Sequence, residues 1–367
     1  MEKLLIKLNK DIKRKEIEKQ WLAAKMGVSP QSLQAYLKGT SKMTFIQFFH
    51  LISNIYENKE ELREMIKIYL EDAKKMDYIK ECLEWSLQNA EYELFELAIS
   101  KVNSETRKIY NLLMLRNQKK IDENELLEQV ETIKLENLKQ KDMEVLVQIV
   151  YLYALNDTKN YNLNTIYSKF IIERVEGMKK GFLKDTYKMK VKELAAVANL
   201  KNNNPEMARS IAEQLIQEVN EDLLPLVLNS VYNLLSEVYV FTDYHKSIEY
   251  NKKAIRLFES LEFGKYQYRE YSLKATHDFI KITNNRYEDL YFNDQSEVAH
   301  FLAKQPSSEM KEEALEILMK MEKQKPLSPH QLYYRYLATG KELDRKIALK
   351  EFYKKGDLYY SRLAENP

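Results

Sequence analysis

The sequence predicts an all-α protein. Residues 40–176 form a run of 137 residues without a glycine or proline, and the whole chain has only seven of each. Sheet proteins need glycine, proline or Asn-Gly turns at short intervals, so this run favours helices joined by short polar turns. Apolar residues recur at spacings of three and four, as in Leu62, Met65, Ile66 and Tyr69, which is the period of a helix with one buried face.

A helix-turn-helix is predicted within residues 20–38, QWLAAKMGVSPQSLQAYLK. Gly27 follows a short first helix, at a position where a left-handed residue ends a helix and glycine pays no steric cost. Ser29 is placed to cap the second helix, and Pro30 occupies its first position, where the missing N–H costs nothing. The second helix buries two leucines and is short and polar elsewhere, which suits the major groove of DNA.

The flanking sequence completes a small repressor-like DNA-binding domain over residues 1–60. Thr44 is placed to cap a further helix, whose inner side carries five apolar residues: Phe45, Phe48, Phe49, Ile52 and Ile55. Residues 1–50 contain ten Lys or Arg and four Asp or Glu, whereas the whole chain has a net charge of only +2. This basic end is consistent with attraction to DNA phosphates, although a solvated basic helix would give the same composition.

Six residues are candidates for contact with DNA. A Gln amide pairs bidentately with adenine, so Gln31 and Gln34 are the expected base-reading residues. The other four are expected to hold phosphates, which fix the register of a protein on the duplex without reading its sequence: Ser29, Ser32, Lys38 and Lys42. The alternative is that the motif is an ordinary pair of helices in a larger helical array, because short motifs also occur by chance.

Helices of ten to twenty residues recur along the rest of the chain, which favours a stacked repeat array over a bundle. The clearest unit is residues 232–258, in which Ser247 and Ala254 are the small residues that let a second helix pack closely on the first. This unit resembles a tetratricopeptide repeat, and residues 194–215 resemble a weaker copy. We therefore predict that residues 61–345 form a right-handed superhelical solenoid of degenerate tetratricopeptide-like repeats.

Residues 346–367 are predicted to form an apolar, tyrosine-rich terminal helix with no repeat after it. Its apolar residues are Leu349, Phe352, Tyr353, Leu358, Tyr359, Tyr360 and Leu363. A solenoid exposes the apolar face of its last repeat, so this helix is expected either to cap the array or to form a two-fold dimer contact. The dimer is attractive because helix-turn-helix proteins commonly bind two half-sites as pairs.

The concave face of the array is expected to bind an extended ligand. Asn229, Asn233 and Glu237 lie one turn apart on a single stripe of the predicted helix before Asp243. The full candidate set for peptide binding is Glu193, Val197, Asn199, Asn202, Asn229, Asn233, Glu237 and His277. Asn amides suit the alternating N–H and C=O groups of a peptide backbone, whereas polar residues on an open helical surface can equally be solvated.

The sequence contains no recognisable catalytic or metal-binding constellation. The patterns GxxxxGK[ST], GxGxxG, GxSxG and HExxH are all absent, and the five histidines lie far apart. The single cysteine, Cys82, excludes an internal disulfide and a zinc site built of thiolates. We expect a binding protein rather than an enzyme, without cofactor or metal. We also expect it in the cytoplasm, since we find no signal peptide and no apolar run long enough to span a bilayer.

Over its full length the sequence resembles the peptide-sensing helix-turn-helix/tetratricopeptide regulators of Gram-positive bacteria, and among them the arbitrium receptors of temperate bacteriophages. The likeness starts at the lysine-rich segment before Trp21 and is strongest in KDTYKMKVKELAAVANLKNN, EVYVFTDYHKSIEYNKKA and EVAHFL. It implies a homodimeric transcription factor that binds double-stranded operator DNA. It also implies that a short signalling peptide in the repeat groove alters DNA binding and so controls the lysis–lysogeny decision. Val197 and Leu226 stand near positions where polar residues are expected, so the cognate peptide should differ from that of the best-known members.

Two other functions remain open at the level of the sequence. A constitutive DNA-binding regulator would use its repeats to recruit a protein partner. A peptide-regulated protein inhibitor would have lost DNA binding, and the intact pattern of a DNA-binding helix over residues 29–38 argues against that loss.

Overall fold

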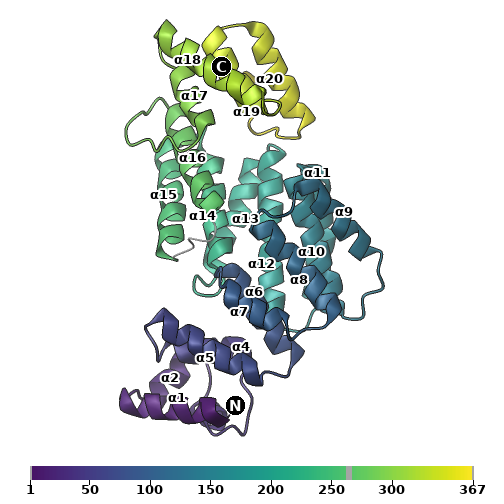
Figure 1. Cartoon of the computed structure of the whole chain (residues 1–367), viewed down its shortest axis with the longest axis vertical. Helices are drawn as coiled ribbons and strands as arrows, with labels where there is room; N and C mark the ends of the chain where they lie inside the picture. Colours follow the sequence, from purple (N-terminus) through teal and green to yellow (C-terminus); the bar gives the residue numbers. More distant parts are fainter. Residues whose placement is uncertain (1, 262–266, 366–367) are drawn as a thin grey trace. The chain divides into compact units, whose positions relative to one another are not determined.

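The computed structural model describes residues 2–261 and 267–365, and within these ranges every regular element is a helix (Figure 1). The chain divides into two compact units. Unit 1 is Met1–Met114 with Lys179–Thr186, and unit 2 is Leu115–Met178 with Tyr187–Pro367. The division of the chain into segments 1–60, 61–345 and 346–367 stays a prediction from the sequence.

Unit 1 contains the first seven helices and most of the eighth, together with the start of α12 (Phe182–Lys201). These helices are α1 (Glu2–Arg14), α2 (Lys19–Lys25), α3 (Pro30–Leu37), α4 (Phe45–Ser53), α5 (Lys59–Asp72), α6 (Met76–Gln88), α7 (Tyr92–Ile99) and α8 (Ser104–Asn117). The predicted helix-turn-helix is confirmed, because α2 and α3 are its two helices.

The ends of these helices follow from their capping residues. Gly27 has a left-handed φ of 64° after α2, and the Ser29 side chain accepts a hydrogen bond from the Ser32 N–H in the first turn of α3. Thr44 and Gln47 form a reciprocal capping box at the start of α4, in which each side chain accepts a backbone N–H of the other residue. Caps of this kind fix where α3 and α4 begin.

Helix α1 packs against the C-terminal end of α3. The Asn9 side chain donates a hydrogen bond to the Leu37 carbonyl oxygen at 3.0 Å. Gly39 has a φ of 75°, and the Leu5 Cδ1 atom lies 2.9 Å from the point that a Cβ at position 39 would occupy. The left-handed turn therefore favours glycine here, and a Cβ at this position would also displace the end of the Leu5 side chain.

Five aromatic rings join α4 to α5 and α6, and we call this cluster the aromatic joint: Phe45, Phe48, Phe49, Tyr69 and Trp85. All five side chains are buried. The Phe48 and Tyr69 rings stack with centroids 4.5 Å apart, and the Phe49 and Trp85 centroids lie 4.8 Å apart. Phe45 contacts both Tyr69 and Trp85, at 5.9 and 5.7 Å between centroids. Apolar packing thus fixes α4 to α5 and α6.

A buried carboxyl group lies beside the aromatic joint. Glu81 in α6 accepts a hydrogen bond from the Ile46 N–H in the first turn of α4, at 3.2 Å. Burial raises the pKa of the Glu81 carboxyl to about 7, and the backbone N–H groups of α4 offset only part of this shift. The ionised carboxylate is therefore disfavoured in folded unit 1.

We expect the stability of unit 1 to fall as the pH rises through neutrality because of Glu81. Its folded pKa of about 7 lies above the ordinary value of about 4.3 for an unfolded chain, so the folded unit binds this proton more tightly. The stabilising contribution is complete below about pH 4 and is lost as the pH rises from there to about 7, by about 3–4 kcal/mol. Glu81→Gln should remove this slope in urea unfolding followed by Trp85 fluorescence, and the exposed Glu93→Gln control should keep it. An unchanged slope in Glu81→Gln would contradict the prediction.

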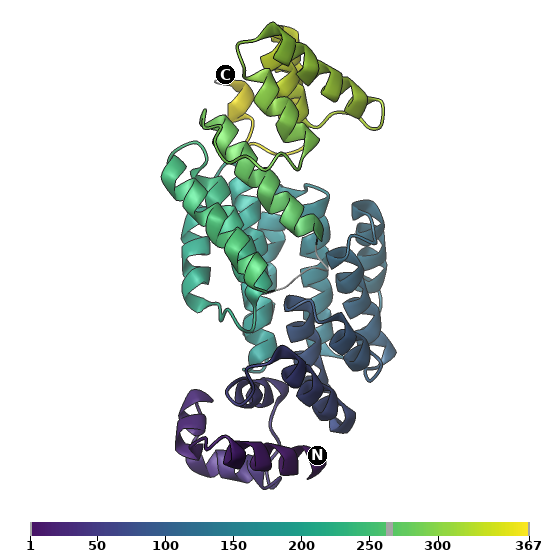
Figure 2. The ribbon, with the colours of Figure 1, turned by 60° about the vertical axis from the view of Figure 1, so that its left-hand side comes forward.

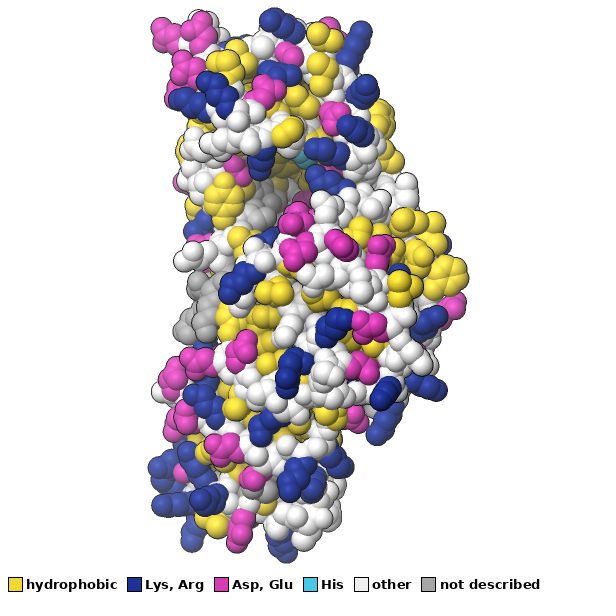
Figure 3. Space-filling view, turned by 45° about the vertical axis from the view of Figure 1, so that its right-hand side comes forward, with side chains coloured by type: hydrophobic (Ala, Val, Ile, Leu, Met, Phe, Trp, Pro, Cys, Tyr) yellow, Lys and Arg dark blue, Asp and Glu magenta, His cyan; other side chains and the backbone are white. Residues whose placement is uncertain are grey.

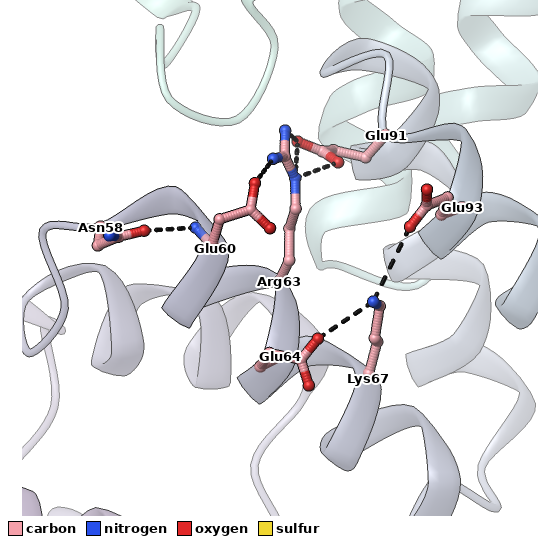
Figure 4. Close-up of polar contacts among 7 residues, drawn as sticks. All are labelled: Asn58, Glu60, Arg63, Glu64, Lys67, Glu91 and Glu93. Atoms are coloured by element: carbon pink, nitrogen blue, oxygen red, sulfur yellow. Dashed lines mark hydrogen bonds and ion pairs between the residues drawn. The ribbon is translucent and has the colours of Figure 1, made fainter.

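Charged side chains link α5 to α7 in unit 1, as Figure 4 shows. The Arg63 Nε and Nη2 atoms donate to the Glu91 carboxylate at 2.9 Å, and Nη1 donates to Glu60 at 2.5 Å. Lys67 lies 3.8 Å from Glu93, and both side chains are exposed. The bidentate Arg63–Glu91 pair is partly buried and has the geometry to stabilise the contact between helices, whereas the Lys67 pair contributes little.

Unit 2 contains the end of α8, most of α12 and the other helices. These are α9 (Glu123–Lys134), α10 (Lys141–Asp157), α11 (Tyr161–Glu176), α13 (Pro205–Glu218), α14 (Pro225–Tyr239), α15 (Tyr244–Ser260), α16 (Gln267–Thr283), α17 (Gln295–Ala303), α18 (Ser308–Glu322), α19 (Pro329–Thr339), α20 (Glu342–Lys354) and α21 (Arg362–Glu365). Helices that follow one another in the chain pack together, as do α9 with α10, α14 with α15 and α15 with α16 (Figures 1 and 2). This nearest-neighbour packing is the pattern of a helical solenoid, so the predicted fold class is confirmed.

The clearest predicted repeat corresponds to α14 and α15. Ser247 and Ala254 are fully buried between the two helices, and Ser247 Oγ donates to the Ser236 carbonyl oxygen at 2.6 Å. Asp243 caps α15 by accepting a hydrogen bond from the Lys246 N–H. The small residues therefore do what the repeat pattern requires, since they let the two helices approach closely.

The prediction of one terminal helix over residues 346–367 is wrong. Helix α20 ends before Gly356, whose left-handed φ of 66° does not continue a helix, and only the short α21 follows. Tyr359 and Tyr360 lie in the segment between α20 and α21, and both are buried within unit 2, as a cap requires. The two-fold contact stays a prediction, and residues 366–367 lie outside the described residues.

Candidate functional site

Unit 1 presents the candidate DNA-contacting residues on and beside α3. Five of the six side chains are exposed: Ser29, Gln31, Gln34, Lys38 and Lys42. Ser32 is half-buried, and its Oγ atom lies 2.9 Å from that of Ser29. The amides of Gln31 and Gln34 thus lie on the exposed side of α3. The two serine hydroxyls are near its start, and the two lysines follow its end. The division between base-reading and phosphate-holding side chains stays a prediction.

The surface around α3 is basic. Figure 3 shows Lys and Arg side chains spread over the surface, with several of them on the N-terminal helices beside Asp and Glu side chains. Lys3, Lys7, Lys10 and Lys13 are exposed on α1, whereas Asp11 on the same helix is buried. Positive charge is therefore concentrated on the helices that hold the recognition helix, as contact with a phosphate backbone requires.

Unit 2 contains a pocket of about 280 Å³ between α8, α10, α12, α14 and α16. Five of the eight candidate peptide-binding residues line it: Glu193, Val197, Asn229, Asn233 and Glu237. They come from α12 and α14, the first helices of two successive repeats. The predicted stripe on α14 and its equivalent on α12 therefore face one pocket.

Amide oxygens in the pocket wall lack hydrogen-bond partners. Asn156 Oδ1, Asn229 Oδ1 and Asn233 Oδ1 are buried, and none accepts a hydrogen bond within residues 2–261 and 267–365. The amide nitrogens of two of them are already used, since Asn229 donates to the Ala254 carbonyl oxygen and Asn233 to Glu237. A buried acceptor without a donor costs about 1–3 kcal/mol. A ligand that brought N–H groups into the pocket would remove this cost.

Both signs of charge occur in the pocket wall. Burial raises the pKa of the Glu193 carboxyl, and the nearby Arg269 guanidinium and the Ser230 hydroxyl offset part of the shift. Arg116 donates two hydrogen bonds to Asp157, at 2.7 and 2.8 Å. These groups are held in place before any ligand arrives.

The remaining three candidates do not line this pocket. The Asn199 amide nitrogen donates to a backbone carbonyl oxygen of its own helix. Asn202 donates to Thr165 Oγ1 at 3.0 Å and lines a second cavity of about 650 Å³. His277 is buried and lies 3.0 Å from the Asn251 side-chain oxygen. All three side chains thus form hydrogen bonds within unit 2, away from the pocket that the other five candidates line.

Several pocket residues were missed from the sequence: Arg116, Lys119, Asn156, Tyr153, Ser230, Tyr268, Arg269 and Ser272. They lie on α8, α10, α14 and α16 or directly after α8, and only α14 belongs to a repeat recognised from the sequence. A helical-period scan of these segments could have found Arg116 and Arg269 as cations on an otherwise apolar face. It could not have placed that face toward α12 and α14, because the degenerate repeats do not fix the register.

Metal-ligating and nucleophilic side chains of the described residues are not gathered into a site. Within residues 2–261 and 267–365, no group of three His, Cys, Asp or Glu side chains is arranged to hold a metal ion. Cys82 is buried, and burial raises the pKa of its thiol to about 12, so it is held as an unreactive thiol. Among the helices of the described chain, none is long and apolar enough to cross a membrane.

Solved structures with the same fold are known. The chain superimposes on a phAimR structure with a TM-score of 0.69 and 17% identity, covering 98% of this chain and 95% of that one. A phAimR–ligand structure gives a TM-score of 0.66 and 20% identity, covering 84% of this chain and 96% of the other. At these identities the similarity establishes the fold.

Sequence comparison identifies the family. An uncharacterized protein of Bacillus anthracis is 23% identical over 163 residues, which cover 44% of this chain and 60% of the length of that protein. Residues 60–366 match the AimR transcriptional regulator-like family. The predicted likeness to the arbitrium receptors and the prediction of a regulator rather than an enzyme are thereby confirmed. Because this match runs over most of the chain, the protein belongs to the AimR transcriptional regulator-like family.

Proposed function

We propose that this protein is a peptide-responsive DNA-binding transcription regulator that controls the lysis–lysogeny decision of a temperate phage. It acts as a homodimer in the cytoplasm of the host bacterium. A short communication peptide binds in the pocket of unit 2 and alters the binding of α3 to operator DNA. One observation carries this proposal: the chain combines an exposed helix-turn-helix in unit 1 with a pocket in unit 2 whose amide oxygens lack hydrogen-bond partners among the described residues.

The DNA-binding half of the proposal rests on unit 1. Gln31 and Gln34 are exposed on a helix whose opposite face packs on α1 and α2, so their amides are presented on a rigid support. Lys38 and Lys42 follow the helix and are exposed. Rigid presentation of a few amides among cations is what readout of the major groove requires.

The peptide-binding half rests on the pocket of unit 2. Its unpartnered oxygens belong to Asn156, Asn229 and Asn233, so a ligand gains most by supplying N–H groups. A peptide backbone carries such a donor at each residue except proline, and it supplies carbonyl acceptors for the Arg and Ser side chains of the wall. The pocket also has apolar positions, among them Val197 and Leu226, which favour a peptide with apolar side chains over a sugar or a nucleotide.

A salt series tests the DNA-binding half. Duplexes selected from a randomised pool on the full-length protein should bind with an affinity that falls steeply with salt. Lys38→Ala should weaken binding similarly on all selected sequences and reduce the slope of log K against log salt by about one unit. Lys169→Ala, a change of the same kind on the exposed side of α11, should leave affinity and slope unchanged. Equal slopes for wild type and Lys38→Ala would exclude this role of Lys38.

Calorimetry tests the peptide-binding half. Synthetic short peptides encoded next to the gene should bind the full-length protein, and a saturating peptide should change its affinity for a selected duplex. Binding of a peptide without any change in DNA affinity would separate the two functions. Absence of binding by every such peptide would favour a constitutive regulator instead.

A further inference from the structure

The outer side of α2 carries an exposed aromatic ring among polar side chains. Leu22 and Ala23 are buried, which turns the opposite side of the helix to solvent. Four exposed residues make up that side, which we call the α2 face: Gln20, Trp21, Ala24 and Lys25. Trp21 is 44% exposed. A tryptophan presents a large, rigid contact area and a polar N–H together, which is why this residue type is enriched at interfaces.

A neighbouring cation accompanies the ring. The Lys25 Nζ atom, one helical turn after Trp21, stands 5.7 Å from the centroid of the Trp21 ring, which is within the range of a cation–π interaction. This contact restricts the rotamers of both side chains before a partner arrives, so less conformational entropy is lost when they bind. The indole and the ammonium group are therefore presented side by side to a single partner.

The polar groups of α2 are mostly hydrogen-bond donors. The indole N–H of Trp21 and the ammonium groups of Lys19 and Lys25 donate only, and the Gln20 amide can donate as well as accept. Helix α2 contains no acidic residue. A partner that complements this face is rich in acceptors and in negative charge. The backbone of DNA has this composition, because its phosphate oxygens accept hydrogen bonds and each phosphate carries a negative charge.

We propose that the α2 face contacts the DNA backbone, with the Trp21 indole N–H donating to a phosphate oxygen and Lys25 neutralising a phosphate. This inference rests on the proposed function, because it concerns the same complex with operator DNA. In a helix-turn-helix the second helix lies in the major groove while the first helix crosses the backbone. Helix α2 is that first helix and packs on α3. The contact adds affinity without reading the sequence of the bases.

Two substitutions in the α2 face have different expected signatures. Trp21→Phe should weaken binding of the full-length protein to all selected duplexes by about three- to tenfold, because a hydrogen bond to a charged group is lost. It changes no charge, so the slope of log K against log salt should stay the same. Lys25→Gln should instead reduce that slope by about one unit.

A matched control separates these effects from the loss of any exposed ring. Phe170→Ala removes an exposed ring from α11 and should change neither the affinity for DNA nor the slope. Matching circular dichroism spectra and melting temperatures establish that all three variants are folded.

Fluorescence quenching reports on the ring in the complex. The chain has two tryptophans, and Trp85 is buried, so acrylamide quenches mainly the exposed Trp21. A saturating duplex should lower the quenching of the wild-type protein. Trp21→Phe should show little quenching with or without the duplex, which assigns the signal to Trp21. A purely structural role of Trp21 would leave its ring as accessible in the complex as in the free protein.

The outcomes separate the inference from the proposed function. Undiminished quenching of Trp21 in the complex would overturn the inference and leave DNA binding by α3 intact. Wild-type affinity in both Trp21→Phe and Lys25→Gln would also overturn it, because the α2 face would then lie near the duplex without contributing to binding. A loss in Trp21→Phe that is confined to one duplex sequence would make Trp21 a base-reading residue and overturn the backbone assignment. Failure of the wild-type protein to bind any selected duplex would overturn the proposed function itself, and with it this inference.

Discussion

Phe45→Ala should lower the free energy of unfolding of unit 1 by about 3–5 kcal/mol. The ring is fully buried in the aromatic joint and contacts Tyr69 of α5 and Trp85 of α6. Its removal leaves a cavity at the point where α4 meets these two helices, and their rings cannot close it without losing their own contacts. The predicted loss is therefore near the upper end of what a single buried side chain contributes.

Fluorescence gives a direct measurement, because the chain has only two tryptophans. Trp85 is buried in the aromatic joint, whereas Trp21 is 44% exposed, so the change on unfolding reports mainly on the joint. Urea unfolding of Phe45→Ala should show a lower midpoint with a similar slope.

Phe170→Ala is the matched control for this prediction. The Phe170 ring on α11 is 60% exposed, so the same substitution removes little buried surface and should change stability by less than about 1 kcal/mol. A midpoint for Phe45→Ala as close to wild type as that of Phe170→Ala would show that the aromatic joint contributes little to the stability of unit 1.

The DNA-binding helices could be predicted from the sequence because their signals are local. Gly27, Ser29 and Pro30 each mark a helix boundary through their own backbone or side-chain chemistry. Helix α2 ends before Gly27, and α3 begins at Pro30 after its cap Ser29. The stripe on α14 was predictable for the same reason, since residues four apart on one helix share a face wherever that helix packs. Asn229, Asn233 and Glu237 do line one pocket.

The composition of the pocket could not be predicted because it depends on contacts between distant segments. Arg116 and Arg269 come from α8 and α16, and only the packing of the intervening helices brings them to one pocket. Helical periodicity shows that each lies on some face of its helix, but not which helix that face meets. His277 illustrates the opposite error, because this polar residue, two helices beyond the stripe, contacts Asn251 of α15 and so serves the packing of α16.

The C-terminal segment shows the same limit. Gly356 was visible in the sequence, but the apolar spacing around it favoured an unbroken helix. The structure instead turns the chain after α20, so that the Leu358 N–H donates to the Lys201 carbonyl oxygen at 2.8 Å. Tyr359 and Tyr360 then pack on Phe241, at 5.3 and 5.9 Å between ring centroids. A contact between residues so far apart in the chain leaves no periodic trace in the sequence.

Glu237→Ala should lower the free energy of unfolding of unit 2 by about 3–5 kcal/mol, because it breaks a mostly buried ion pair from one side. The Glu237 carboxylate accepts hydrogen bonds from Lys201 at 3.1 Å and from the Tyr360 hydroxyl at 3.0 Å. Lys201 is also 4.3 Å from the Tyr360 ring centroid and 3.8 Å from Asp357. Burial lowers the pKa of Lys201, and the carboxylates of Asp357 and Glu237 more than reverse this effect. Without Glu237, the ammonium group keeps only the more distant carboxylate.

Glu218→Ala provides the control, because Glu218 also forms an ion pair with a lysine of α12. Glu218 pairs with Lys192 of α12 at 2.7 Å, but it does not line the pocket and its side chain is 42% exposed. Its loss should cost less than about 1 kcal/mol, as is usual for a solvated pair. Thermal unfolding by calorimetry compares the two variants, and similar melting temperatures for both would mean that the Glu237–Lys201 pair is as solvated as the control.

The consequence of Glu237→Ala should reach the C-terminal segment. Glu237 lines the pocket with one face and holds Tyr360 with its carboxylate, and its carbonyl oxygen accepts a hydrogen bond from the Tyr359 hydroxyl at 3.0 Å. The Leu358 amide, which is bonded to Lys201, should therefore exchange its hydrogen faster in Glu237→Ala than in wild type or Glu218→Ala. If exchange at Leu358 is unchanged while stability falls, the segment is held by its tyrosine packing alone. Faster exchange would show that the Glu237 carboxylate, which lines the pocket, also holds the C-terminal segment in place.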